Sequence, residues 1–481
     1  MPTPLSVRVI QNPSDGFRWL PHLEIAEPDL RVSLDVLGGN RIRARMSGPA
    51  VPALRGGEHK ADLPVSPGEV RAAAARLCKR WKLAFVDYQP TDAAGKPQSG
   101  RARPYSSAAD LSTEPEGELR GVVGELARSG ASVLFDVLFA GDDERVELFR
   151  TYLVMALAQE GLRVRFDAAE MHLPWPMLCL RPEHLSSFRG QTTGTELERD
   201  VLPQNRGTGS TPSRAPIQGG PDPQEAEPVG DTMVQEELTL DDLFALFLGH
   251  RHQIEHTGDA YPWVQSPPYP QQLPTVSLNH DTAVGKKTRA PEVAAALEDG
   301  TSCTVRTTYR ELVRDLDARD LHEQLMYFWC HGYFEPNGPE PAQLVIRLTD
   351  GMLFDGHTVR ERRARHRRAG TFHPFVVLNA CHAGTAAGDA DRAFLGRVLI
   401  EHGAQGVLGP QIEMPQVFAA EYALAFVQRY LGGGPTATAG KITHDLAQHF
   451  ASHYRNPLGF AYALHCGMDA FLQSAKVMAS S

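Results

Sequence analysis

The sequence has few cysteines. Its six cysteines are scattered over 481 residues, and none forms a Cys-x-x-Cys pair. A disulfide framework and a zinc ribbon both need paired or closely spaced cysteines, so neither is expected. Free thiols are typical of a reducing compartment, which also keeps a nucleophilic thiol reduced. The sequence therefore predicts a cytoplasmic protein without a disulfide framework.

Long apolar runs and an excess of positive charge are also missing. No apolar run approaches the ~18 residues of a membrane span, and residues 1–16 lack the basic and apolar stretches of a signal peptide. With 48 basic against 58 acidic residues, the formal net charge of −10 gives no general attraction to nucleic acid or to anionic membranes. We expect neither nucleic acid nor a membrane as a direct partner.

One polar segment divides the chain. Hydrophobic residues make up 42% and charged residues 22% of the sequence, which is ordinary for a chain that buries a core. Over 189–236, Gly, Pro, Thr, Ser, Gln and Glu replace the apolar periodicity found on both sides. We predict an N-terminal lobe over 1–188, a flexible linker or insertion over 189–236, and a catalytic lobe over 237–481.

Alternating strand and helix patterns predict an α/β fold on both sides of this segment. Before it, the apolar patterns of 132–139 and 162–166 are those of strands, and 146–158 between them has helical spacing. After it, strands are expected near four positions and helices over three stretches. The strands lie near Met326, Gln343, Phe375 and Gln405, and the helices start at Asp241 or span 392–400 and 416–431.

Two of the apolar runs end abruptly in small and polar residues, at 327–332 (YFWCHG) and 375–384 (FVVLNACHAG). Each is typical of a buried parallel strand that delivers a reactive side chain at its carboxyl end, the edge where open α/β sheets bind ligands. If His331 and Cys381 end neighbouring strands, an imidazole meets a thiol there. Because this arrangement activates a cysteine as a nucleophile, the sequence predicts a cysteine endopeptidase.

The residues around the two candidates favour a catalytic role. A lone cysteine is more often a small core residue, and a lone histidine more often a structural one. However, the Asn-Ala-Cys-His-Ala-Gly context lets the backbone turn sharply and lets a substrate carbonyl approach the Cys381 amide. Gly332, directly after His331, exposes a second amide. We expect Cys381 as nucleophile, His331 as base, and the amides of Gly332 and Cys381 as oxyanion donors.

Zinc is the competing interpretation, because Cys330, His331, Cys381 and His382 together offer four ligands. Adjacent residues on a strand point to opposite faces, so each Cys-His pair supplies one ligand to a given site. The four residues would thus give two ligands, whereas a structural zinc site has four. A second histidine-rich segment, 250–256, is interpreted as a helix surface or a packing feature. The sequence thus predicts neither a metal nor a cofactor.

These motifs resemble the CHAT family of caspase-like cysteine peptidases, which are related to separase, caspases and gingipains. The resemblance is carried by Cys-His-Gly at 330–332 and Asn-Ala-Cys at 379–381, with the histidine about 50 residues upstream of the cysteine, as in caspases. Further similar stretches are 173–178, 247–252, 403–409 and 456–459. Pro176 departs from the family, which usually carries Glu there.

The resemblance implies a caspase-like, mostly parallel sheet sandwiched by helices, with the N-terminal half forming a related pseudo-caspase lobe. It also implies a peptidase of bacterial antiviral defence or programmed death. The expected substrate is a protein effector, such as a pore-forming protein or another zymogen. Because no sensor module is visible in the sequence, the trigger is expected from a separate sensor or activator protein, or through the N-terminal lobe.

The substrate specificity of the expected peptidase is predicted from one acidic residue. Relatives that cleave after basic residues hold a carboxylate at the base of the S1 pocket, and Glu413 is the best-placed acid in this sequence, with Asp389 and Asp391 as reserves. We therefore predict cleavage after Arg or Lys. A second class of function stays open, a catalytically silent caspase-like scaffold that binds a partner protein, although a scaffold has no need of His331 and Cys381 together. A serine hydrolase is disfavoured, since a Gly-x-Ser-x-Gly elbow is missing.

Overall fold

The computed structural model describes residues 27–38, 40–53, 58–91, 96–98, 101–189, 238–258, 273–337, 340–366, 371–381, 383 and 395–472. The linker predicted over 189–236 lies, apart from its first residue, outside these ranges. The division of the chain into two lobes therefore stays a prediction. In the described ranges, no helix combines the length and the apolar character that a membrane span requires.

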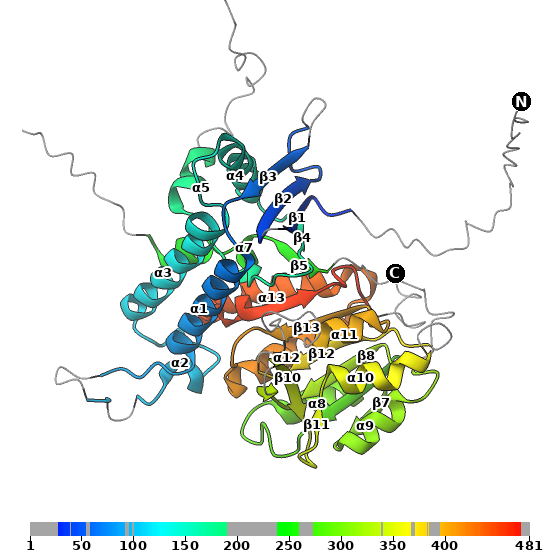
Figure 1. The fold of residues 1–481 in the computed structure, drawn as a ribbon. Coiled ribbons are helices and arrows are strands. Elements are labelled where there is room, and N and C mark those ends of the chain that lie inside the picture. The colour runs from blue at the N-terminus through cyan, green and yellow to red at the C-terminus, as the bar shows by residue number, and fades with distance from the viewer. Residues whose placement is uncertain are drawn as a thin grey trace, which may run out of the picture.

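One sheet of eleven strands runs through both halves of the chain, in the order β3-β2-β1-β4-β5-β14-β13-β12-β8-β6-β7. Figure 1 shows the N-terminal strands at one end of this sheet and β7 toward the other. The strands are β1 (Leu30–Leu37), β2 (Arg41–Ser47), β3 (His59–Leu63), β4 (Arg163–Asp167), β5 (Gln253–Thr257), β6 (Thr275–His280), β7 (Ser302–Arg306), β8 (Leu325–Trp329), β12 (Phe375–Asn379), β13 (Gly406–Pro410) and β14 (Tyr462–His465).

Most neighbouring strands of this sheet are parallel. The exceptions are the edge hairpins β1–β2 and β2–β3, and the β13–β14 pair near the middle. The parallel pairing of β4 with β5 joins the strands of the N-terminal half to those of the C-terminal half. The predicted mostly parallel α/β sheet is confirmed.

Helices cover both faces of the sheet (Figure 1). They are α1 (Pro67–Phe85), α2 (Pro104–Ser107), α3 (Glu116–Ser132), α4 (Glu144–Leu157), α5 (Pro182–Arg189), α6 (Leu240–Phe244), α7 (Leu248–Arg251), α8 (Ala290–Glu298), α9 (Tyr309–Leu316), α10 (Gly356–Arg363), α11 (Leu395–Glu401), α12 (Gln416–Gly432) and α13 (Ala439–Tyr454).

The two faces hold separate hydrophobic clusters, because side chains alternate along each strand. On β8, Tyr327 packs into the larger cluster with α8, α12 and α13, and Phe328 packs into the smaller cluster with α9, α10 and α11. Both β8 and β12 are completely buried, as their unbroken apolar sequences predict. These two strands therefore form the centre of the C-terminal core.

A small antiparallel sheet follows β8 directly. It consists of β9 (His331–Asn337), β10 (Glu340–Arg347) and β11 (Leu353–Phe354), in the order β11-β10-β9. The strand expected near Gln343 is therefore present, but it belongs to this separate sheet. The chain leaves the main sheet at Cys330 and enters the small one at His331.

One predicted element is wrong. Residues 132–139 were expected to form a strand, but α3 runs to Ser132 and continues as a π-helix over Val133–Leu138. The apolar run in this segment is buried on several sides, and periodicity cannot separate a buried helix from a buried strand. The helix expected over 146–158 is α4, the strand expected over 162–166 is β4, and the helices expected at the C-terminal end are α11 and α12.

Candidate active site

The two sequence motifs lie at one edge of the sheet. Strands β8 and β12 are parallel neighbours, and Trp329 is paired with Asn379. His331 and Cys381 each follow two residues after this pair, so both leave the sheet at the same edge. The predicted neighbourhood of the two strand ends is therefore present in the structure.

The two strand ends touch at Gly332. A β-carbon at this position would collide with the carbonyl oxygen of Cys381 and would lie 3.1 Å from the Ala380 β-carbon. A glycine is therefore required for this close approach. After β12 the backbone turns sharply, because the Ala383 amide donates to the Ala380 carbonyl at 3.1 Å. This turn presents Cys381 at the edge, half-buried.

A buried hydrogen-bond network holds the end of β12 in place. The Asn379 amide group donates to the Tyr327 hydroxyl at 3.2 Å and to the Ala419 carbonyl at 3.0 Å. Its oxygen accepts from the Tyr462 hydroxyl at 3.0 Å. These contacts tie β12 to β8, α12 and β14, two residues before Cys381. The sequence analysis assigned no role to Asn379. Its position as the polar residue that ends the apolar run of β12 is the sequence signal that could have identified it.

The surroundings of Cys381 favour its neutral form. Burial raises the pKa of the Cys381 thiol, and the nearby Glu413 carboxylate raises it further. The backbone amide of Met414 and the ammonium of Lys82 act in the opposite direction. In the part of the chain that the structure describes, no hydrogen bond joins the His331 ring to the Cys381 thiol. The balance of these effects raises the pKa of Cys381, with burial as the largest cause.

Glu413 lies beside the candidate nucleophile. It follows β13, which is the parallel neighbour of β12, so its loop emerges at the same edge as Cys381. Its side chain is 45% exposed and forms an ion pair with Lys82 of α1, with 3.3 Å between Nζ and Oε2. Lys82 also contacts Asp87 at 2.9 Å. The N-terminal half thus contributes a cation to this edge, which sequence analysis did not foresee.

Of the other residues named from the sequence, three lie outside the described ranges and one is buried. Those outside are Asp389, Asp391 and His382. Cys330 is buried in the smaller hydrophobic cluster with Ala380, on the face that strand alternation predicts, and burial raises its pKa far above the usual range. Within the described ranges, the side chains arranged to hold a metal ion are three histidines elsewhere, His172, His256 and His465.

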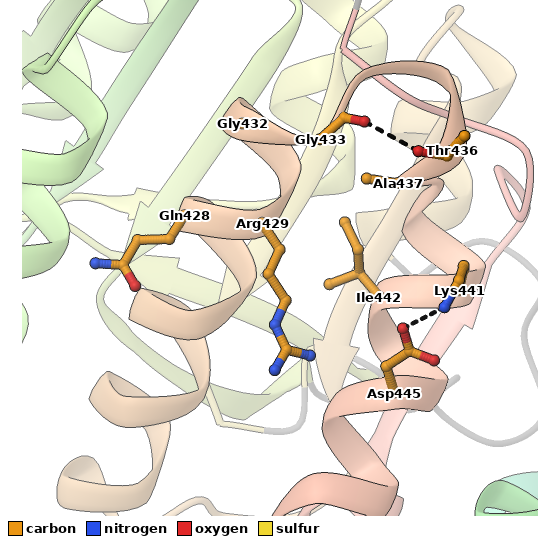
Figure 2. Close-up of a pocket in the computed structure, with 9 residues that line it drawn as sticks. All are labelled: Gln428, Arg429, Gly432, Gly433, Thr436, Ala437, Lys441, Ile442 and Asp445. Atoms are coloured by element: carbon orange, nitrogen blue, oxygen red, sulfur yellow. Dashed lines mark hydrogen bonds and ion pairs between the residues drawn. The ribbon is translucent and has the colours of Figure 1, made fainter.

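A pocket opens between the C-terminal end of α12 and the first half of α13. Figure 2 shows Arg429 of α12 facing Ile442 and Asp445 of α13, with Lys441 paired to Asp445. None of its lining residues comes from the two strand-end motifs or from the Glu413 loop. The candidate active site is therefore the strand edge, and this pocket is separate from it.

Comparisons with known proteins give similarities to one family, one curated protein and two crystal structures. Residues 210–441 match the family model of the CHAT domain. Over 151 residues, 30% of this chain, the sequence is 29% identical to a probable protease of Vitiosangium sp. (strain GDMCC 1.1324), of which it spans 18%. Two crystal structures of the separase–securin complex of Saccharomyces cerevisiae are similar with TM-scores of 0.43 and 0.42. Their sequence identities are 11% and 10%, over 91% of this chain and 30% of the matched chain.

Proposed function

We propose that this chain is an active caspase-like cysteine endopeptidase with His331 and Cys381 as its catalytic dyad, a proposal supported by the match of residues 210–441 to the CHAT domain. The observation that carries the proposal is the contact of Gly332 with the Cys381 backbone. Since His331 precedes Gly332 directly, the imidazole and the thiol belong to one small region of the sheet edge. Nucleophilic cysteine catalysis needs this proximity of base and thiol, together with a hydrogen bond between them.

The proposed reaction proceeds in two steps. His331 takes the proton from Cys381 Sγ, and the thiolate attacks the carbonyl carbon of the scissile peptide bond. The amides of Gly332 and Cys381 donate to the oxyanion, and the carbon–nitrogen bond breaks as His331 returns the proton to the leaving amine. A water molecule, deprotonated by His331, then hydrolyses the thioester and frees Cys381.

In this proposal the described conformation is the resting form of the enzyme. The raised pKa of Cys381 favours the protonated thiol, and among the described residues no hydrogen bond from His331 assists its deprotonation. Catalysis therefore requires a rearrangement that brings the imidazole onto the thiol. Substrate, a separate sensor or activator protein, or both supply that rearrangement.

We assign specificity for Arg or Lys to Glu413. Its carboxylate neighbours Cys381 and already binds an ammonium, that of Lys82. A basic substrate side chain would form the same contact after displacing Lys82. The further elements of the proposal are a protein effector of a bacterial defence or death system as substrate, such as a pore-forming protein, and a cytoplasmic location that keeps Cys381 reduced.

The direct test is cleavage of peptidyl-Arg substrates by the purified chain and its Cys381→Ala variant. We expect the variant to lose all cleavage while its circular dichroism stays unchanged. Cys303→Ala, which removes a half-buried thiol on β7, serves as the control and keeps full activity. Cleavage that survives in Cys381→Ala would refute the assignment. A wild-type chain that neither cleaves peptides nor reacts at Cys381, alone or with candidate activator proteins present, would favour the silent scaffold.

A further inference from the structure

Three histidines from distant parts of the sequence meet inside the protein. His256 on β5 and His465 on β14 are partners in the parallel pairing of these strands. His172, in the segment after β4, packs over both rings, with centroid distances of 5.2 Å to His256 and 5.3 Å to His465. One ring nitrogen from each residue lies within 4.8 Å of the others. We call these residues the histidine cluster.

The spacing of two of the nitrogens fits a tetrahedral metal. The Nδ1 atoms of His256 and His465 are 3.3 Å apart. Two nitrogens bound to zinc at about 2.0–2.1 Å with tetrahedral angles lie about 3.3 Å apart. Strand pairing fixes this spacing, because the two residues are neighbours across the β5–β14 ladder.

His172 offers the third nitrogen in the correct tautomer. Its Nε2 lies 3.1 Å from Oε1 of Gln411, an oxygen that can only accept, so Nε2 carries the proton. The Gln411 amide nitrogen in turn points to Met177 Sδ at 3.7 Å, which supports this orientation of the amide. The His172 Nδ1 therefore bears a lone pair. It is buried without a hydrogen-bond partner, on a side chain that is only 9% exposed.

An ion at the cluster would satisfy a buried polar atom. The Nδ1 of His172 lies in the interior without a hydrogen-bond partner. Without an ion, the unpaired buried Nδ1 of His172 opposes folding, since polar atoms are normally satisfied in the interior.

We propose that His172, His256 and His465 bind one zinc ion through their ring nitrogens. Zinc is the occupant because it binds imidazole nitrogens in tetrahedral geometry, and three histidine ligands leave one position for water. The ion would join the segment after β4 to β5 and β14. Its binding also bears on the candidate active site, because Gln411 orients His172 and begins the loop that carries Glu413 and Met414.

The test uses the full-length chain, first freed of metal with a chelator and then titrated with zinc. We expect one equivalent to bind and to raise the unfolding temperature. Cobalt in place of zinc should give the visible absorption of a tetrahedral site. Wild-type protein that binds no zinc or cobalt in this experiment overturns the proposal.

Variants identify the ligands. His172→Ala should abolish zinc binding, and Gln411→Ala should weaken it about 10- to 100-fold by freeing the His172 ring. His373→Ala, a half-buried histidine that contacts the Gly403 carbonyl, is the matched control and keeps one equivalent. If His172→Ala does not fold, Gln411→Ala decides the matter, since unchanged zinc affinity in that variant contradicts the assigned geometry.

Discussion

The ammonium of Lys82 lies 3.3 Å from the carboxylate of Glu413. Lys82 belongs to helix α1 near the start of the chain, and Glu413 belongs to the loop that follows β13 beside Cys381. The N-terminal half therefore places a cation on the acid to which we assign substrate recognition. In the proposed function, Lys82 occupies the position of a basic substrate side chain in the resting enzyme.

Removing this cation should improve substrate binding. Lys82→Ala frees the Glu413 carboxylate, so we expect the KM for peptidyl-Arg substrates to fall by about 1.5- to 5-fold, the range of a partly exposed ion pair. Steady-state kinetics of the active enzyme measure this effect. The control is Lys79→Ala, an exposed lysine on the same helix. A KM that rises in Lys82→Ala would show that Lys82 supports substrate binding.

Glu413→Gln should change specificity. Loss of the charge is expected to lower kcat/KM for peptidyl-Arg substrates by about 10- to 100-fold, the value of a charge-assisted hydrogen bond, with little effect on peptidyl-Gln substrates. Glu421→Gln removes an acid of α12 that pairs with Arg289 and should leave both values unchanged. Equal losses for both substrates in Glu413→Gln would remove Glu413 from the S1 pocket.

Glu413→Gln should also shift the pH dependence of Cys381 alkylation. The Glu413 carboxylate raises the pKa of the Cys381 thiol, since a negative charge disfavours the thiolate. Neutralising that carboxylate lowers the pKa, so the rise of alkylation rate with pH should move to lower pH. Iodoacetamide labelling followed by peptide mapping measures this profile. A shift to higher pH would contradict the described proximity of the two side chains.

Gly332→Ala should destabilise the protein. The new methyl group would meet the Cys381 carbonyl oxygen, and we expect a loss of about 1–3 kcal/mol in the free energy of unfolding from overpacking. Denaturant titration measures it. In the control variant, Gly121→Ala in α3, the methyl group meets nothing within 4 Å, so stability should stay unchanged or rise by up to about 1 kcal/mol. Equal stability of the two variants would mean that the strand ends do not touch.

The sequence was sufficient to predict the central strands of the C-terminal half. The runs at β8 and β12 are entirely apolar and end in small residues, so their burial in a parallel sheet follows from local pattern, whereas their pairing with each other was assumed. The strand predicted over 132–139 was wrong, because an apolar run without clear periodicity fits a buried helix as well as a strand. The strand near Gln343 was found, but a single strand does not reveal which sheet it joins.

The long-range contacts could not be predicted. Lys82 and Glu413 come from opposite halves of the chain, and each lies in a segment of ordinary composition. His172, His256 and His465 are equally dispersed, so the histidine-rich segment 250–256 gave no sign that one member, His256, lies beside two others. The histidine contacts depend on the pairing of β5 with β14 in the centre of the sheet. No local sequence pattern indicates which strands pair.

Labelling of the native protein with a peptidyl-Arg acyloxymethyl ketone tests the central claim most directly. Mass spectrometry should find Cys381 modified and the other thiols unmodified, among them Cys78, whose pKa burial raises to about 12. Replacement of His331 by Ala should abolish the modification, because in the proposed dyad the imidazole activates the thiol. Modification of Cys381 that is equally fast without His331, or reagent found on other cysteines while Cys381 stays free, would contradict the His331–Cys381 dyad.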